Sequence, residues 1–123
     1  MADKEIRIAE LESLIDRYID AARQHGEATE RGDWRTANAA AASIAAIYAE
    51  LRRRGPDAQR QLLRLLFDPS PGVSGWAGAH ALEFAPSEGA AALTRLASSP
   101  GLAGLSAETT LKEWRNGRLK FPD

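Results

Sequence analysis

His80 and Glu83 are the two residues of this 123-residue sequence whose types and spacing could do chemistry together. They lie three positions apart in a segment that we expect to be helical, so their side chains share one helix face. An imidazole beside a carboxylate can bind a metal ion or transfer a proton. His80 also continues an apolar row with Val73, Ala77 and Phe84, where a packed, hydrogen-bonded histidine is the simpler interpretation. We therefore favour a structural His80 and keep a small enzyme or metal-dependent protein using His80 and Glu83 as the alternative.

The second histidine, His25, is expected in the seam of a helical hairpin, opposite Ala41 and near Asn38. There a ring nitrogen can form a hydrogen bond across the two helices, which is a structural role. In a layered arrangement of helices this position is far from His80. The chain has two histidines and no cysteine, so a metal site would need carboxylate ligands as well, and thiolate chemistry and disulfides are impossible.

The segment Ser70–Gly75 places glycines and hydroxyls at an expected helix start, where free backbone amides could bind phosphate. It contains no lysine and lacks the spacing of a phosphate-binding loop, and it does not have the final glycine of a nucleophile elbow. We interpret it as a helix cap and turn. The sequence offers no other catalytic motif, so we expect neither enzymatic activity nor a cofactor.

Arg52, Arg53 and Arg54, with Arg60 and Arg64 on the next expected helix, form the one basic cluster of the sequence. Such a cluster could indicate a weak nucleic-acid binder. The chain holds 16 basic and 17 acidic residues, for a formal net charge of −1, and neither half carries a basic excess. Three cations at a helix end also suit the negative end of the helix dipole. We therefore interpret these arginines as helix-end residues and do not expect nucleic acid as a partner.

The elements that must position these residues are all expected to be helices. The length fits a single domain, residues 1–123, and 44% of the residues are hydrophobic. In residues 1–54, apolar side chains recur every three or four positions, which predicts one helix from about Lys4 to Arg31 and another from about Trp34 to Arg54. Gly32 and Asp33 supply the C-cap of the first helix and the N-cap of the second. The first helix either continues through Gly26 or breaks at His25, and we expect it to continue.

A tight turn makes this hairpin antiparallel, which fixes the residues that face each other across it. The expected pairs are Thr29 with Ala37, His25 with Ala41, Ala22 with Ile44, and Tyr18 with Tyr48. Trp34 and Leu51 belong to the same apolar row of the second helix and are also expected in the core.

The C-terminal half contains an internal repeat. Ser70–Gly75 aligns with Ser99–Gly104, and Leu82 with Leu111, at an offset of 29 residues. The repeat predicts two helix pairs, residues 57–84 and 86–116, with helices at about 57–67, 72–84, 86–98 and 102–116. Val73 and Leu102 occupy equivalent positions and should both point into the interior. Prolines 69, 71, 86 and 100 fall at the expected joints.

These features together resemble a bacterial family of small, uncharacterised HEAT-like proteins with an armadillo-type fold. The matching strings are Gly32-Asp33, Ala37-Asn38, Val73, Trp76-Ala77, His80 to Phe84, Ser106 to Glu108, Leu111 and Glu113 to Arg115. The resemblance implies an all-α, short right-handed superhelix of about three antiparallel helix pairs, and it supplies no catalytic or binding residues. Ser74 stands where HEAT repeats usually have arginine, so an arginine–aspartate ladder between repeats is in doubt. Some small helical-repeat proteins of this kind look like immunity partners of bacterial toxins.

The function expected from this scaffold is that of a protein interaction module, regulatory or immunity-type, without chemistry of its own. The candidate partner surface comprises Trp76, His80, Glu83, Glu108, Trp114 and Arg115. The two tryptophans are more often packing residues. The N-terminal residues mix charged with apolar side chains and no stretch reaches membrane-spanning length, so we expect a cytoplasmic protein without a membrane partner. Pairing with a second copy of the chain is left open.

Overall fold

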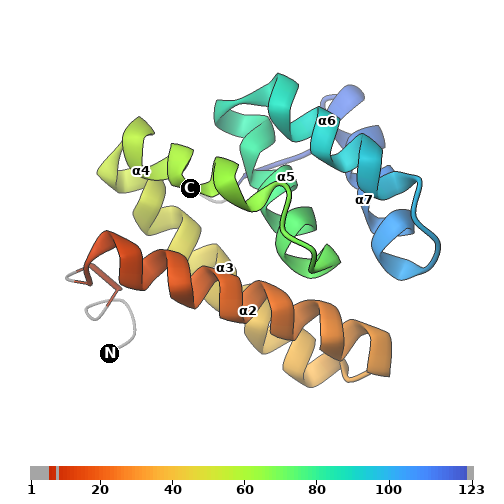
Figure 1. Cartoon of the computed structure of the whole chain (residues 1–123), viewed down its shortest axis with the longest axis horizontal. Helices are drawn as coiled ribbons and strands as arrows, with labels where there is room; N and C mark the ends of the chain where they lie inside the picture. The colour runs from red at the N-terminus through yellow and green to blue at the C-terminus, as the bar shows by residue number, and fades with distance from the viewer. Residues whose placement is uncertain (1–5, 8, 122–123) are drawn as a thin grey trace.

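The computed structural model describes residues 6, 7 and 9–121, and these residues form helices without any strand, as the all-α prediction requires (Figure 1). In chain order the elements are α2 (Leu11–Arg31), α3 (Trp34–Arg54), the short α4 (Pro56–Arg60), the 3₁₀-helix η1 (Gln61–Leu65), α5 (Pro71–Phe84), α6 (Pro86–Ala97) and α7 (Leu102–Arg115). In Figure 1 the α2–α3 hairpin forms the lower part of the molecule, and α5, α6 and α7 lie above it.

The turn between α2 and α3 is the one that the sequence predicts. Gly32 ends α2 in the left-handed conformation, with a φ of 73°, and its N–H donates to the carbonyls of Ala28 and Thr29. The Asp33 side chain then accepts a hydrogen bond from the backbone N–H of Thr36, which caps the start of α3. The hairpin is therefore antiparallel, and α2 and α3 pack along each other.

The beginning of the first helix differs from the prediction. The expected start at Lys4 lies outside the described residues, but Glu10 is extended, with a ψ of 151°, so the helix through Arg31 begins only at Leu11. The Arg54 Nη2 donates to the carbonyl oxygens of Ile6, Arg7 and Ala9, so the chain ahead of α2 is bound to the end of α3.

Helix α2 continues without a break through Gly26, as expected, and the packing explains why a glycine stands there. A Cβ on Gly26 would lie 3.2 Å from the Cα of Gly72, at the start of α5, and a Cβ on Gly72 would lie 2.5 Å from the carbonyl oxygen of Ala22. The two backbones therefore touch at this crossing, and only glycine allows α5 to approach α2 so closely.

Three further expectations need correction. The helix expected at 57–67 is a single α-turn followed by a 3₁₀ segment that ends at Leu65, ahead of the prolines that lead into α5. Trp34 is 65% exposed rather than in the core, because it occupies the first turn of α3, beyond the end of α2. Val73 is fully buried, but its repeat equivalent Leu102 is 46% exposed, so the two halves of the repeat do not share one environment.

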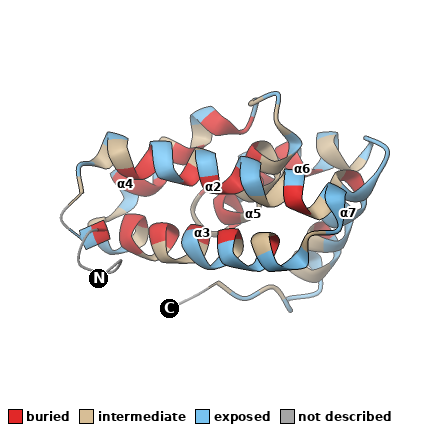
Figure 2. Ribbon diagram, turned by 90° about the horizontal axis from the view of Figure 1, so that it is seen from below, coloured by how far each residue is buried: buried red, intermediate tan, exposed pale blue. Residues whose placement is uncertain are grey.

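The interior is divided between two clusters of buried side chains, and α5 contributes to both. The larger cluster joins α2, α3, α4, η1 and α5 with one residue of α6, Ala92, and it includes Ile15, Tyr18, Tyr48, Leu62 and Val73. The smaller cluster joins Leu82 of α5 to Leu93, Ala107 and Leu111, with Trp114, Leu119 and Phe121 packed against it. Figure 2 shows buried positions recurring along one face of α2 and of α3, with exposed positions between them. Helix α5 is thus the element on which the other helices converge.

We predict that Gly72→Ala destabilises the protein by about 1–3 kcal/mol, because its methyl group would meet the backbone of α2 rather than a mobile side chain. Gly75→Ala is the matched control on the same helix, since its methyl group would meet only the end of the Leu96 side chain, at 3.3 Å. Alanine is favoured over glycine in a helix, so the control should be neutral or stabilising. Urea unfolding of both variants is the measurement, and an equally stable Gly72→Ala protein would show that the crossing is not close.

Candidate functional site

His80 lies in the interior, between helices that are far apart in the sequence. It is 5% exposed, its Nδ1 shares a 2.7 Å hydrogen bond with the Tyr18 hydroxyl, and its ring stacks on Tyr48 with centroids 3.9 Å apart and planes 5° apart. Trp76, one turn earlier on α5, lies against the same ring at 5.8 Å. The expected pair Tyr18 and Tyr48 therefore meets at this histidine, which joins α2, α3 and α5.

Glu83 is also engaged from neighbouring helices. The Tyr48 hydroxyl donates to its Oε1, and the Arg52 guanidinium forms an ion pair with its Oε2 at 2.5 Å. The amide of Gln59, on α4, donates to the Tyr48 oxygen at 3.0 Å. We call these six residues the buried polar network: Tyr18, Tyr48, Arg52, Gln59, His80 and Glu83.

The environment of the network suppresses charge on its aromatic members. Burial lowers the pKa of His80 from 6.5 to about 3, so its ring is neutral at pH 7. Burial, with the negative field of Tyr48 adding to it, raises the pKa of Tyr18 well above 10. The pKa of Tyr48 is raised by burial first and then by its hydrogen bond to Glu83. A neutral imidazole enclosed by three rings is suited to joining helices rather than to exchanging protons with a substrate.

The alternative of a metal site at His80 and Glu83 has no support from the geometry. In the part of the chain that the structure describes, no three histidine or acidic side chains lie close enough together to hold a metal ion. Glu83 instead faces Tyr48 and Arg52, and His80 faces Tyr18. The buried, hydrogen-bonded His80 is what the structural interpretation predicts.

The buried His80 predicts that stability falls in mild acid. A histidine whose folded pKa lies below its unfolded value binds more protons when unfolded, so its contribution is complete above pH 6.5 and is lost as the pH falls toward 3. The free energy of unfolding should drop by about 2 kcal/mol between pH 7 and pH 5. Urea unfolding at both pH values measures this drop. Most of the drop should be lost in His80→Gln and kept in His25→Gln, because the pKa of His80 is shifted further than that of His25. An unchanged drop in His80→Gln would contradict the assignment.

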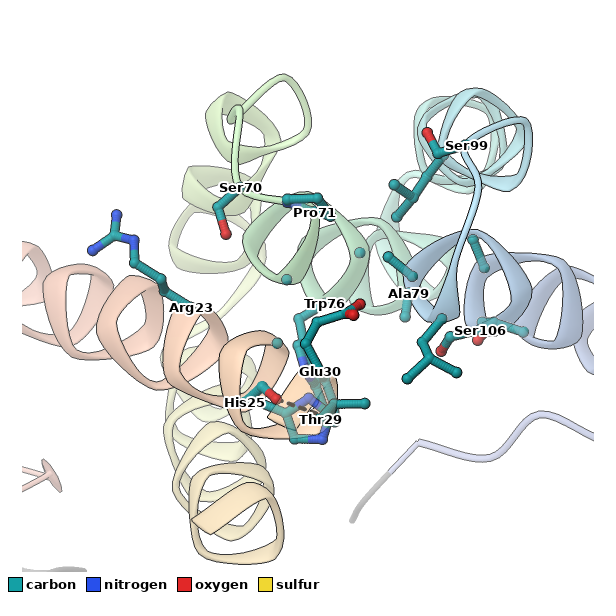
Figure 3. A pocket seen from close by; sticks show the side chains of 18 of the residues that line it. Arg23, His25, Thr29, Glu30, Ser70, Pro71, Trp76, Ala79, Ser99 and Ser106 are labelled. Carbon is teal, nitrogen blue, oxygen red and sulfur yellow. Dashed lines mark hydrogen bonds between the residues drawn. The ribbon is translucent and has the colours of Figure 1, made fainter. Parts of the chain in front are cut away.

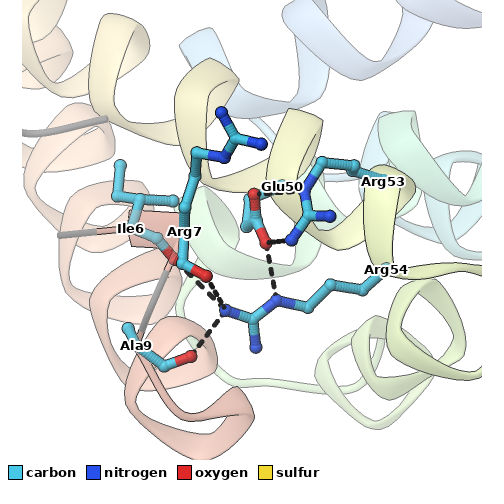
Figure 4. Close-up of polar contacts among 6 residues, drawn as sticks. All are labelled: Ile6, Arg7, Ala9, Glu50, Arg53 and Arg54. Atoms are coloured by element: carbon cyan, nitrogen blue, oxygen red, sulfur yellow. Dashed lines mark hydrogen bonds and ion pairs between the residues drawn. The ribbon is translucent and has the colours of Figure 1, made fainter. Parts of the chain in front are cut away.

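The basic cluster at the end of α3 is occupied by internal contacts (Figure 4). The nearly buried carboxylate of Glu50 binds Arg53 through Nε and Nη2 at 2.9 and 2.6 Å, and Arg54 through Nε at 2.7 Å. Arg54 also holds the N-terminal carbonyls described above, and Arg52 binds Glu83. The hydrogen bond from Arg53 is the main cause that lowers the pKa of Glu50 from 4.5 to about 2. Arg52, Arg53 and Arg54 are thus tied to carboxylates, in keeping with a structural role.

Glu50→Gln should therefore destabilise the protein at neutral pH, since the arginines lose the carboxylate between them. Because the folded pKa is depressed, this contribution is present above pH 4.5 and is lost as the pH falls toward 2. Allowing for solvent screening at the exposed Arg53, we expect a difference from the wild type of about 1–2 kcal/mol at pH 6 that shrinks by pH 3. Chemical denaturation across this pH range tests it. A difference that stays constant with pH would assign the effect to packing instead of charge.

Trp76 also lines an open groove on the surface of the molecule (Figure 3). Its volume is about 540 Å³. The C-terminal half of α2 and the first half of α7 form its walls, and α5 and the end of α6 form its floor. Apolar side chains dominate the floor, namely Trp76, Ala79, Leu93 and Leu96, and Leu102 and Ala103 continue this surface on α7. We call this the α2–α7 groove.

His25 lies in this groove and not in the hairpin seam, which corrects the sequence-based expectation. Its ring meets Trp76 edge to face at 5.1 Å, so it faces α5 rather than Ala41 and Asn38 of α3. Partial burial lowers its pKa below 6.5. It is also not remote from His80, because Trp76 contacts both imidazoles. The sequence pattern placed His25 on the apolar row of α2 that packs against α3. Near the C-terminal end of α2, the residues of this row face α5 instead.

The six residues of the candidate partner surface do not form one surface. Trp76 lines the groove, whereas His80 is buried and Glu83 is bound within the network. Glu108 and Arg115 are exposed on α7, outside the groove, and Trp114 packs on the smaller core cluster. The structure therefore keeps only Trp76 of this set as an accessible groove residue.

The groove residues that sequence analysis missed are Leu93, Leu96 and Leu102. Their helical spacing is typical of a core row, and Leu93 is in fact a core residue at 1% exposure. Leu96 is partly exposed and Leu102 is 46% exposed, so these two are the ones that the core leaves accessible. Val73 and Leu102 occupy equivalent positions of the repeat, but one is buried and the other is exposed. The sequence alone does not reveal this difference in burial.

Comparison of the chain with protein-family models, with characterised proteins and with solved structures found no match. The function must therefore be argued from the residues and their geometry. In the described part of the chain, no helix combines the length and the apolar run that crossing a bilayer requires.

Proposed function

We propose that this chain is a cytoplasmic protein interaction module, without chemistry of its own, whose α2–α7 groove receives a segment of a partner protein. The observation that carries the proposal is the groove itself. It combines an open apolar floor with a polar rim, whereas interior polar side chains that could do chemistry are held by one another. Apolar pockets with a few polar groups at the edge are typical binding sites.

The scaffold of the proposal is a short HEAT-like superhelix of three helix pairs. The pairs are α2 with α3, the α4–η1 segment with α5, and α6 with α7, and the members of each pair contact each other. Helical repeats of this type bind their partners in the extended grooves that the stacked helices form. A regulatory or immunity-type role is proposed by analogy with other small helical-repeat proteins.

An exposed apolar side chain at the edge of the groove supports the same proposal. Leu102, in the first turn of α7, is 46% exposed and lines the groove. A large apolar side chain at the edge of a concave site is characteristic of protein interfaces. Water covers Leu102 in the free chain, so burying it against a partner would be favourable.

Two leucines on one helix turn provide a matched test. Leu102→Gln should weaken capture of the partner from an extract of the native host at least tenfold, because it places an amide in the apolar wall. Leu105→Gln, three residues further on and outside the groove, should leave capture nearly unchanged. Both side chains are exposed, so neither variant should alter the melting temperature. Quantitative mass spectrometry measures how much partner each variant captures relative to the wild type. Equal capture by Leu102→Gln and the wild type would reject the groove as the site.

A further inference from the structure

The α2 wall of the groove carries a net negative charge, with two glutamates against one arginine. Glu27 and Glu30 both line the groove and are exposed, and neither forms an ion pair with a described residue. Arg23 is the basic residue of this wall, but it pairs with Asp20 at 3.8 Å, and Figure 3 shows it apart from the other groove side chains. The opposite wall on α7 presents hydroxyls, such as Ser106 and Thr110, and no charge.

An aromatic ring lies beside one of these carboxylates, that of Glu30. Figure 3 shows Trp76 next to Glu30, with His25 and Thr29 below it and Ser106 across the groove. An indole and a carboxylate on one side of a partly dry pocket attract an organic cation, the first through its ring quadrupole and the second through its charge. Because the pKa of His25 is lowered, its imidazole is uncharged at pH 7 and does not compensate the two glutamates.

The rest of the groove suits apolar side chains spaced along a helix. The α2 wall runs from Arg23 to Glu30, which is about 10 Å or two helical turns at 1.5 Å per residue. The walls are sides of helices, and the described residues contain no strand edge that could pair with an extended peptide. An amphipathic helix is the segment that such a groove accepts, with apolar anchors at positions i and i+4 or i+7.

We propose that the α2–α7 groove binds an amphipathic helical segment of a partner protein that carries one basic side chain, arginine or lysine, beside its apolar anchors. The apolar anchors contact Leu96 and Leu102. The cation lies beside the Trp76 ring, on the side of the groove that carries Glu27 and Glu30. This inference rests on the proposed function and adds the chemistry of the partner. Charge complementarity selects the basic segment, because the groove offers carboxylates without partners and an uncharged opposite wall.

The test uses three synthetic peptides and the whole chain. The first is an alanine-based helical peptide of about 15 residues, with leucines at i and i+4 and one arginine at i+7. The second has citrulline in place of arginine, which keeps the shape and removes the charge. The third keeps the arginine and replaces both leucines with glutamine. Titration into ¹⁵N-labelled protein follows the indole N–H of Trp76 and gives the Kd of each peptide.

We expect the arginine peptide to bind at least tenfold more tightly than the citrulline peptide, and the advantage to shrink as salt is added. In a Glu27→Gln, Glu30→Gln double variant the advantage should vanish. Glu108→Gln is the matched control, since Glu108 is exposed on α7 outside the groove, and it should keep the advantage. The glutamine-substituted peptide should bind weakly to every protein.

Several outcomes would overturn this inference. Equal binding of the arginine and citrulline peptides would show that the groove does not select a basic side chain, while leaving the proposed function intact. No Trp76 shift with any peptide up to about 1 mM would reject the helical segment. A Trp76 signal that moves with protein concentration alone would identify a second copy of the chain as the occupant. The proposed function itself fails separately, through partner capture that does not depend on Leu102.

Discussion

The close crossing of α2 and α5 is the constraint on which the rest of the structure depends. Where Gly26 meets Gly72 the two backbones are in contact, so α5 lies against α2 at the distance that two helices without side chains allow. That placement brings His80 to the Tyr18 hydroxyl and Trp76 to His25. It also leaves α2 and α7 with few contacts to each other, and the groove lies between them. One backbone contact thus positions both the buried network and the open site.

The buried polar network gives the larger core its specificity. An apolar core alone would tolerate small shifts of α3 against α5, but Tyr48 must both stack on His80 and donate to Glu83, which allows one register of the two helices. Each of its polar atoms that is removed from water has a partner within the described residues. The histidine and glutamate that looked reactive in the sequence therefore serve to align helices.

Local signals in the sequence predict most of the helices, because the ends of a helix are set by residues that are neighbours in the chain. Gly32 and Asp33 define the hairpin turn, and prolines 71 and 86 are the first residues of α5 and α6. The errors arise where distant residues decide. Arg54 binds the Ala9 carbonyl, ahead of α2, from 45 residues away along the chain, and the exposure of Leu102 depends on where α7 docks. The direction of His25 depends likewise on α5, so the groove could not be derived from periodicity.

The division of the interior into two clusters has a mechanical consequence. Helix α7 is held by the smaller cluster, through Ala107 and Leu111, whereas α2 belongs to the larger one. The two walls of the α2–α7 groove therefore rest on different clusters, which are linked by α5 and by α6, since α6 contributes Ala92 to the larger cluster and Leu93 to the smaller. A shift of α7 would therefore widen the groove without displacing the tyrosines around His80.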